Sequence, residues 1–217
     1  MRLAGSWPIT PESWRWIFQL SGAPALLGIL ILMVIPESPE WLRARLAVKH
    51  PAPPLRELFR PALLRTTLTA IIVSVIPMAG AWAASKWMIP WADKVAGPSN
   101  ALYKAATQGW WALGAILGAI AGAQLASRLG SRRSYQLISI GATTLTIAMF
   151  QLTAPLQPGF HAIVFVQGLV ATLFFGWLAL YLPSLFPVHV RATGAGLAYN
   201  SGRFGTAIGV LMAGILF

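Results

Sequence analysis

The sequence contains no cysteine and only five acidic residues among its 217 positions. The absence of cysteine excludes a disulfide framework, a thiolate metal site and a cysteine nucleophile. Charged residues of both signs make up 10% of the chain, whereas hydrophobic residues make up 57%. This composition is too apolar for an ordinary soluble domain.

The apolar residues form four blocks that contain no Asp, Glu, Lys or Arg: 16–36, 66–85, 105–127 and 134–188. A helix needs about 20 apolar residues to cross a bilayer, so three blocks fit one helix each and the fourth fits two. The segment TAPLQPG divides the fourth block, because prolines and glycine mark a turn. We therefore expect an all-α membrane protein, a bundle of about six transmembrane helices. Their predicted ranges are Trp16–Ile35, Leu63–Trp87, Lys104–Ala126, Ser134–Thr153, Phe160–Leu182 and Thr193–Phe217.

The net charge of +11 does not indicate a nucleic-acid partner. A nucleic-acid face needs basic residues clustered on a folded surface, often among stacking aromatics. Here the basic residues fall in the gaps between the apolar blocks, which is typical of cytoplasmic loops in membrane proteins. The expected partner is a lipid bilayer, and the N-terminal segment lacks the order of a signal peptide.

The distribution of basic residues predicts the orientation of the helices. The gaps 36–62, 128–133 and 183–192 hold most of the arginines, so these gaps are predicted to be cytoplasmic and the N-terminus to lie outside. Only fourteen residues follow Arg203, and they rise about 21 Å, less than a bilayer core of about 30 Å. An external N-terminus and a short last span both predict that the chain is a fragment.

Two glycine stripes predict close helix packing. Gly114, Gly118 and Gly122 recur every four residues, and Gly205 and Gly209 repeat this spacing in the last predicted helix. Small residues at this spacing let a neighbouring helix approach closely. The alternative is that the stripes are surfaces on which helices slide past one another during a conformational change.

Three loop motifs together resemble the major facilitator superfamily. GAQLASRLGSRR (122–133) is similar to the signature loop between the second and third helices of each six-helix half. PESPEWL (36–42) resembles the stretch that ends the first half in sugar porters, and residues 182–203 resemble the loop between helices ten and eleven of sugar and organic-acid porters. All three motifs give the same numbering, helix six to helix eleven.

The resemblance implies how the chain is divided. Residues 1–35 would be an outer segment and the last helix of the N-terminal half, 36–62 the cytoplasmic linker between halves, and 63–217 five helices of the C-terminal half. The fold would then be the C-terminal half of a major facilitator bundle plus helix six. Helices one to five and twelve would be missing, and would have to come from a longer chain or a second one.

The function that the resemblance implies is secondary transport of a small solute, a sugar or an organic acid, by alternating access with proton coupling. The location would be the bacterial inner membrane, with no enzymatic activity, catalytic residue, metal or cofactor. No Asp or Glu lies inside any predicted span, so a carboxylate proton carrier would lie in the missing helices, or transport would be uncoupled. The alternative is a non-transporting remnant, or a half-transporter module that needs a partner chain.

The predicted substrate-binding residues are Trp82, Lys86, Gln108 and Asn200. A lysine that faces the cavity would bind an anionic solute, although Lys86 can instead extend to the outer interface. The tryptophans suit either a stacking surface or an interfacial aromatic belt. For Gln108, Gln124 and Gln167, hydrogen bonding between helices is the favoured interpretation.

The predicted gating network consists of Glu37, Glu40, Gly122, Arg128, Arg132, Arg133, Arg191 and Arg203. Arginines at the cytoplasmic mouth would bind helix carbonyls and acidic partners in the opposite half. The chain has Ser127 and Ser184 where the family usually has acidic residues, which puts a fully standard gate in doubt. We expect Glu40 to supply a partner to Arg133, Arg191 or Arg203; the alternative is a weak local pair with Arg43 or Arg45.

Overall fold

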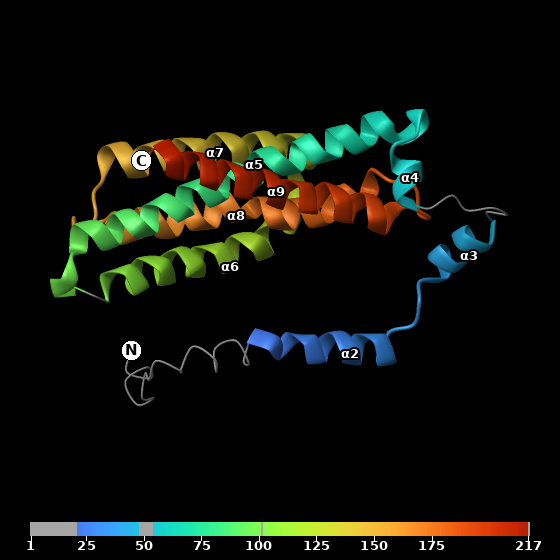
Figure 1. Cartoon of the computed structure of the whole chain (residues 1–217), viewed down its shortest axis with the longest axis horizontal. Helices are drawn as coiled ribbons and strands as arrows, with labels where there is room; N and C mark the ends of the chain where they lie inside the picture. Colours follow the sequence, from blue (N-terminus) through green and yellow to red (C-terminus); the bar gives the residue numbers. More distant parts are fainter. Residues whose placement is uncertain (1–20, 48–53, 101, 217) are drawn as a thin grey trace. The chain divides into compact units, whose positions relative to one another are not determined.

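The computed structural model describes residues 21–47, 54–100 and 102–216, and the side chains of residues 45, 54, 83–86 and 213–216 also lie outside that description. The described residues form helices and connecting turns, with no strand among them (Figure 1). The chain divides into two units, residues 1–49 and 50–217, and each is described by itself.

Two helices make up the described part of the first unit, α2 (Pro24–Val34) and α3 (Pro39–Ala47). The PESP stretch separates them. Ile35 is extended, as the residue before a proline prefers, so α2 ends at Val34. Pro39 then begins α3, since a proline at the first helical position loses no hydrogen bond. Helix α2 lies within the predicted range Trp16–Ile35 and ends one residue before its predicted end, while residues 16–20 of that range lie outside the described part.

The second unit contains α4 (Pro54–Leu58), α5 (Pro61–Ala96), η1 (Pro98–Asn100), α6 (Tyr103–Leu129), α7 (Ser131–Leu152), α8 (Phe160–Ser184) and α9 (Arg191–Leu216). Helices α5 to α9 run lengthwise beside one another (Figure 1). Four of the described helices, α5 to α8, are long and apolar enough to cross a membrane. The boundaries of α6 to α9 agree with the predicted ranges to within three residues.

The predicted end of α5 at Trp87 is wrong. Helix α5 continues for nine more residues and runs unbroken through Pro77 and Pro90. Its 36 residues rise about 54 Å, which exceeds a bilayer core of about 30 Å. The polar residues Asp93 and Lys94 therefore belong to a helical extension of the span, and a drop in hydropathy did not mark the end of the helix.

The glycine stripe of α6 packs directly against the backbone of α8. A Cβ atom added at Gly114, Gly118 or Gly122 would overlap the carbonyl oxygens of Phe165, Leu169 and Leu173, respectively. The reverse holds on α8, where a Cβ at Gly176 would lie 2.5 Å from the carbonyl oxygen of Ala119. This confirms the predicted packing role of the stripe, Gly122 included.

The second stripe is only partly confirmed. A Cβ at Gly205 of α9 would lie 2.7 Å from Val75 Cγ1 of α5, so Gly205 does allow close packing. Among the described residues Gly209 has no neighbour within 4 Å of such a Cβ, and the second close contact is instead made by Gly202 against Met78. The contact surface between α9 and α5 therefore follows a three-residue step, and the predicted role of Gly209 is wrong.

A single residue, Gly130, connects α6 to α7. Its φ of 79° lies in the left-handed region, which a residue with a side chain rarely adopts. Ser134 Oγ donates to the carbonyl oxygens of Leu125 and Gly130, and Trp177 Nε1 donates to the carbonyl oxygen of Ser131. These bonds fix the end of α6, the start of α7 and the end of α8 together.

Candidate functional site

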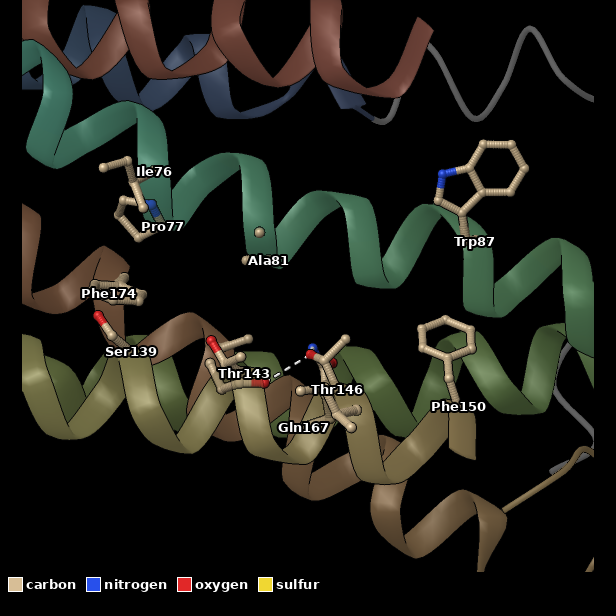
Figure 2. A pocket seen from close by; sticks show the side chains of 14 residues that line it. Ile76, Pro77, Ala81, Trp87, Ser139, Thr143, Thr146, Phe150, Gln167 and Phe174 are labelled. Atoms are coloured by element: carbon tan, nitrogen blue, oxygen red, sulfur yellow. Dashed lines mark hydrogen bonds between the residues drawn. The ribbon is translucent and has the colours of Figure 1, made fainter. Parts of the chain in front are cut away.

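A cavity of about 450 Å³ lies among α5, α7 and α8. Helix α5 contributes mainly apolar residues, among them Ile76, Pro77 and Ala81, which face α7 across the cavity in Figure 2. Phe150 and Phe174 add aromatic walls. No charged side chain is found among the described residues that line the cavity.

Helix α7 supplies most of the polar groups in the cavity. Ser139, Thr143 and Thr146 are spaced by four and three residues, so their hydroxyls share one face of the helix. This face was missed in the sequence, although the spacing of hydroxyl residues in SIGATTLT was the available signal. The spacing of residues along a helix shows which of them share a face, but it does not show which neighbouring helix that face contacts.

Gln167 of α8 joins three helices at the cavity wall. Its side chain is fully buried. Trp111 Nε1 of α6 donates to Gln167 Oε1 at 2.9 Å, and Gln167 Nε2 donates to Thr146 Oγ1 of α7 at 3.3 Å (Figure 2 shows the second bond). Hydrogen bonding between helices is thus confirmed for Gln167.

The predicted substrate-binding residues lie elsewhere in the second unit. Trp82 is half-buried, and its ring centroid lies 6.2 Å from that of Trp111, next to the Gln167 bonds. Gln108 is exposed on α6, and Asn200 is exposed on α9 with Nδ2 donating to the carbonyl oxygen of Gly196. These three are not among the cavity residues. The side chain of Lys86 lies outside the described residues.

Arginines gather at one end of the second unit, which we call the arginine end. It is the end at which α6 stops and α7 begins, and it carries Arg56, Arg60, Arg65, Arg128, Arg132, Arg133 and Arg191. Arg128 lies in the last turn of α6, where a cation stabilises the helix dipole. Among the described side chains, none of these arginines forms an ion pair.

The other predicted members of the gate have local contacts. Arg191 Nε donates to the carbonyl oxygen of Phe186 at 3.4 Å, and the Arg203 guanidinium lies 5.3 Å from the centre of the Tyr199 ring. Ser127 and Ser184 donate to carbonyl oxygens of their own helices, at Gln124 and Tyr181. These serines therefore offer the arginines no negative charge.

The acidic residue at the arginine end is Glu57 of α4, and it is bound to a histidine. His189 Nε2 lies 2.8 Å from Glu57 Oε1, in the turn between α8 and α9. Leu58 is fully buried beside this pair, and Thr67 Oγ1 of α5 donates to its carbonyl oxygen at 2.9 Å. Helix α4 is thus held against the bundle by one buried side chain and two polar contacts.

Glu37 and Glu40 belong to the first unit. Both are exposed, and Glu40 lies in the first turn of α3, where a carboxylate stabilises the helix N-terminus. No ion pair joins Glu40 to Arg43 within the part of the chain that is described. Stabilisation of α3 is therefore a further role for Glu40 that the sequence did not suggest.

Comparison with known proteins identifies the family. A model of the Major Facilitator Superfamily matches residues 2–210. The cis,cis-muconate transport protein of Acinetobacter baylyi is 26% identical over 99% of this chain and 52% of the relative. The probable 4-methylmuconolactone transporter of Cupriavidus pinatubonensis is 28% identical over 97% of this chain, and the 3-(3-hydroxy-phenyl)propionate transporter of Escherichia coli 27% identical over 93%.

The chain spans about half the length of these curated relatives, 48–52% of each. No solved structure matches. The match to the family model covers nearly every residue from the N-terminal segment into α9, and the all-helical fold with its membrane-length helices agrees with it. The chain belongs to the Major Facilitator Superfamily.

Proposed function

We propose that the chain forms the second half, with the last helix of the first half, of a secondary transporter for a small organic acid in the bacterial inner membrane. The observation that carries this proposal is the match of 93–99% of the chain to relatives named as transporters of muconate, a methylmuconolactone and a hydroxyphenylpropionate. Those names support an organic acid over a sugar as the solute.

The residues available for such a solute fit its chemistry. Muconate is a conjugated dicarboxylate and hydroxyphenylpropionate carries an aromatic ring and a carboxylate, so aromatic faces and amide donors are suitable partners for both. The Trp82 and Trp111 pair supplies aromatic faces, and Gln108 and Asn200 supply amide groups on exposed helix surfaces. Lys86 would supply the cation for the carboxylate. In this proposal the solute binds between the two halves of the transporter.

Alternating access would use the arginine end as the cytoplasmic gate. The unpaired arginines there would bind acidic groups of the other half in the outward-facing state and lose them when the gate opens. The orientation follows from the excess of arginine, with the linker 36–62 in the cytoplasm and the N-terminus outside. We also propose that transport of the solute is coupled to the movement of protons.

Charge reversal at Glu40 tests its part in the gate. If Glu40 pairs with Arg133, Arg191 or Arg203, Glu40→Arg is expected to change the initial rate of uptake up to about fivefold, because an exposed ion pair contributes up to about 1 kcal/mol. Glu40→Gln removes the charge without reversing it and should give a smaller change. Equal uptake rates for Glu40→Arg and the unchanged protein would show that Glu40 has no part in the gate and only stabilises the N-terminus of α3.

The alternative function is a remnant that does not transport, or a module that needs a second chain. Uptake measured in vesicles from cells that carry the gene, compared with cells from which it is deleted, tests the proposal against this alternative. Loss of organic-acid uptake on deletion is the expected result. Unchanged uptake of every organic acid on deletion would indicate a remnant.

A further inference from the structure

The cavity among α5, α7 and α8 takes no part in the proposed function, in which the solute binds between the two halves of the transporter. Its volume of about 450 Å³ falls within the range of about 300–1,000 Å³ that small-molecule sites in proteins have. Ile76 and Ile147 line it and are 61% and 59% exposed, so the cavity opens at the surface of the unit. A small molecule can therefore enter it while the helices stay packed.

Two hydroxyl groups of α7 indicate a ligand that forms hydrogen bonds. Ser139 and Thr143 lie close to the middle of this membrane-length helix. On the same helix, Ser134, Thr146 and Thr153 donate to the carbonyl oxygen four residues earlier, as such side chains commonly do. The hydroxyls of Ser139 and Thr143 have no hydrogen bond to any of the described residues. Lipid supplies no such partner, and a polar group left without one costs free energy.

A fully buried amide lies in the same wall of the cavity. Gln167 accepts a hydrogen bond from Trp111 through Oε1 and donates to Thr146 through Nε2. The Thr146 hydroxyl donates its own hydrogen to the carbonyl oxygen of Ala142, so this chain of bonds is fixed in one direction. An amide nitrogen carries two hydrogens, and the described residues use one of them here. The polar side of the cavity is therefore held in place before a ligand arrives.

The other lining residues determine the charge and the body of the ligand. None of the described residues that line the cavity is charged. Burying an ion without a partner costs far more free energy than burying a neutral polar group, so an ionised acid does not fit. Phe150 and Phe174 supply aromatic rings, and Phe150 extends from α7 toward α5 in Figure 2. The lining therefore suits an uncharged molecule with an apolar, aromatic body.

We propose that this cavity binds an uncharged aromatic molecule that carries a hydroxyl or carbonyl group, such as a phenol. The ring of the ligand packs against Phe150, Phe174 and the apolar face of α5. Its polar group bonds to the hydroxyls of Ser139 and Thr143. The site differs from the proposed solute site, whose ligand is an anion, and it does not rest on the proposed function. Loss of the transport proposal would leave it unchanged.

The test is binding of radiolabelled 2-naphthol, an uncharged aromatic alcohol at neutral pH, to the full chain immobilised in detergent on scintillation proximity beads. We expect saturable binding that unlabelled 2-naphthol displaces. The ion 2-naphthoate has the same rings with a carboxylate and should not displace it. Absence of saturable binding would overturn the proposal and leave the cavity to water or to a helix from the rest of a transporter. Equal displacement by 2-naphthoate would overturn the assignment of an uncharged ligand.

Two glycine substitutions test where the probe binds. Gly80 lines the cavity, and a Cβ there would meet no atom of the described residues within 4 Å, so Gly80→Leu fills space without displacing a helix. Gly109 has the same freedom but lies on α6, outside the cavity. We expect binding to weaken about tenfold or more in Gly80→Leu, because the ligand must then overpack the site, and to be unchanged in Gly109→Leu. Equal binding by two variants with the unfolding midpoint of the unchanged chain would overturn the proposal.

Substitutions of the two hydroxyl residues test the hydrogen bond and do not depend on filling the cavity. The double variant Ser139→Ala, Thr143→Val should bind 2-naphthol about fivefold more weakly, the factor for one net hydrogen bond of about 1 kcal/mol. Thr143→Ser keeps both hydroxyls and should keep the affinity. The hydrocarbon 2-methylnaphthalene should displace 2-naphthol poorly from the unchanged chain. Equal affinity of the double variant and Thr143→Ser would overturn the proposal and indicate a site for lipid acyl chains.

Discussion

Replacing Gly118 with leucine is expected to prevent the assembly of the α6–α8 pair. A Cβ at this position already overlaps the carbonyl oxygen of Leu169 and the hydroxyl of Thr172, before the rest of the side chain is added. The obstacle is mainly backbone, which cannot rotate away, so the two helices must separate. Overpacking of a core by a few carbons costs about 1–3 kcal/mol, and here the neighbouring contacts at Gly114 and Gly122 would be lost as well.

The measurement is the yield of monodisperse protein in detergent, together with its unfolding midpoint. Gly109 provides the matched control, because it lies on the same helix and a Cβ there would meet no atom of the described residues within 4 Å. Gly109→Ala should be neutral or stabilising, since alanine is favoured over glycine in a helix by about 1 kcal/mol, whereas Gly118→Ala should destabilise. Equal behaviour of the two alanine variants would disprove the close contact.

Gln167→Leu is expected to lower the stability of the bundle by about 1–2 kcal/mol, because two hydrogen bonds are lost and each such bond between helices in a membrane contributes about 0.6 kcal/mol or more. The substitution keeps the volume but removes the acceptor of the Trp111 indole and the donor to Thr146. The indole nitrogen of Trp111 and the hydroxyl of Thr146 would then lose these partners inside the bundle, where water does not replace them. The expected readout is a lower unfolding midpoint with changed fluorescence of Trp111.

Gln108→Leu is the control, because Gln108 is exposed on α6 and a surface substitution typically changes stability by less than about 0.5 kcal/mol. Adding Trp111→Phe to Gln167→Leu should cost less than the sum of the single changes, since both partners of one bond are then absent. A Gln167→Leu variant as stable as Gln108→Leu would show that the bonds contribute nothing.

The helices of the second unit could be predicted where a long apolar block without charged residues is bounded by charged loops. Blocks without charge set the positions of α6, α7 and α8, because crossing a bilayer needs a minimum apolar length and loops collect the charges. The end of α5 was not predictable in this way. A helix that extends beyond the bilayer can contain charged residues, so Asp93 and Lys94 give no signal for stopping.

The site was less predictable than the fold, because it depends on which helix each face meets. The four-residue spacing of Gly114, Gly118 and Gly122 predicted their close packing, yet the same spacing misled at Gly209. The hydroxyls of α7 and the cavity they line depend on the position of α5, which no local pattern gives. The contact between Thr107 and His161 likewise joins residues that are 54 apart in sequence.

We propose that the chain belongs to a transporter of small organic acids. The most direct measurement is uptake of a labelled unsaturated dicarboxylate into energised membrane vesicles, from cells that carry the gene and from cells that lack it. We predict uptake that is lost on deletion, that unlabelled aromatic and unsaturated acids inhibit, and that hexoses leave unchanged. Uptake of the acid that persists on deletion, with loss of hexose uptake instead, would contradict the account.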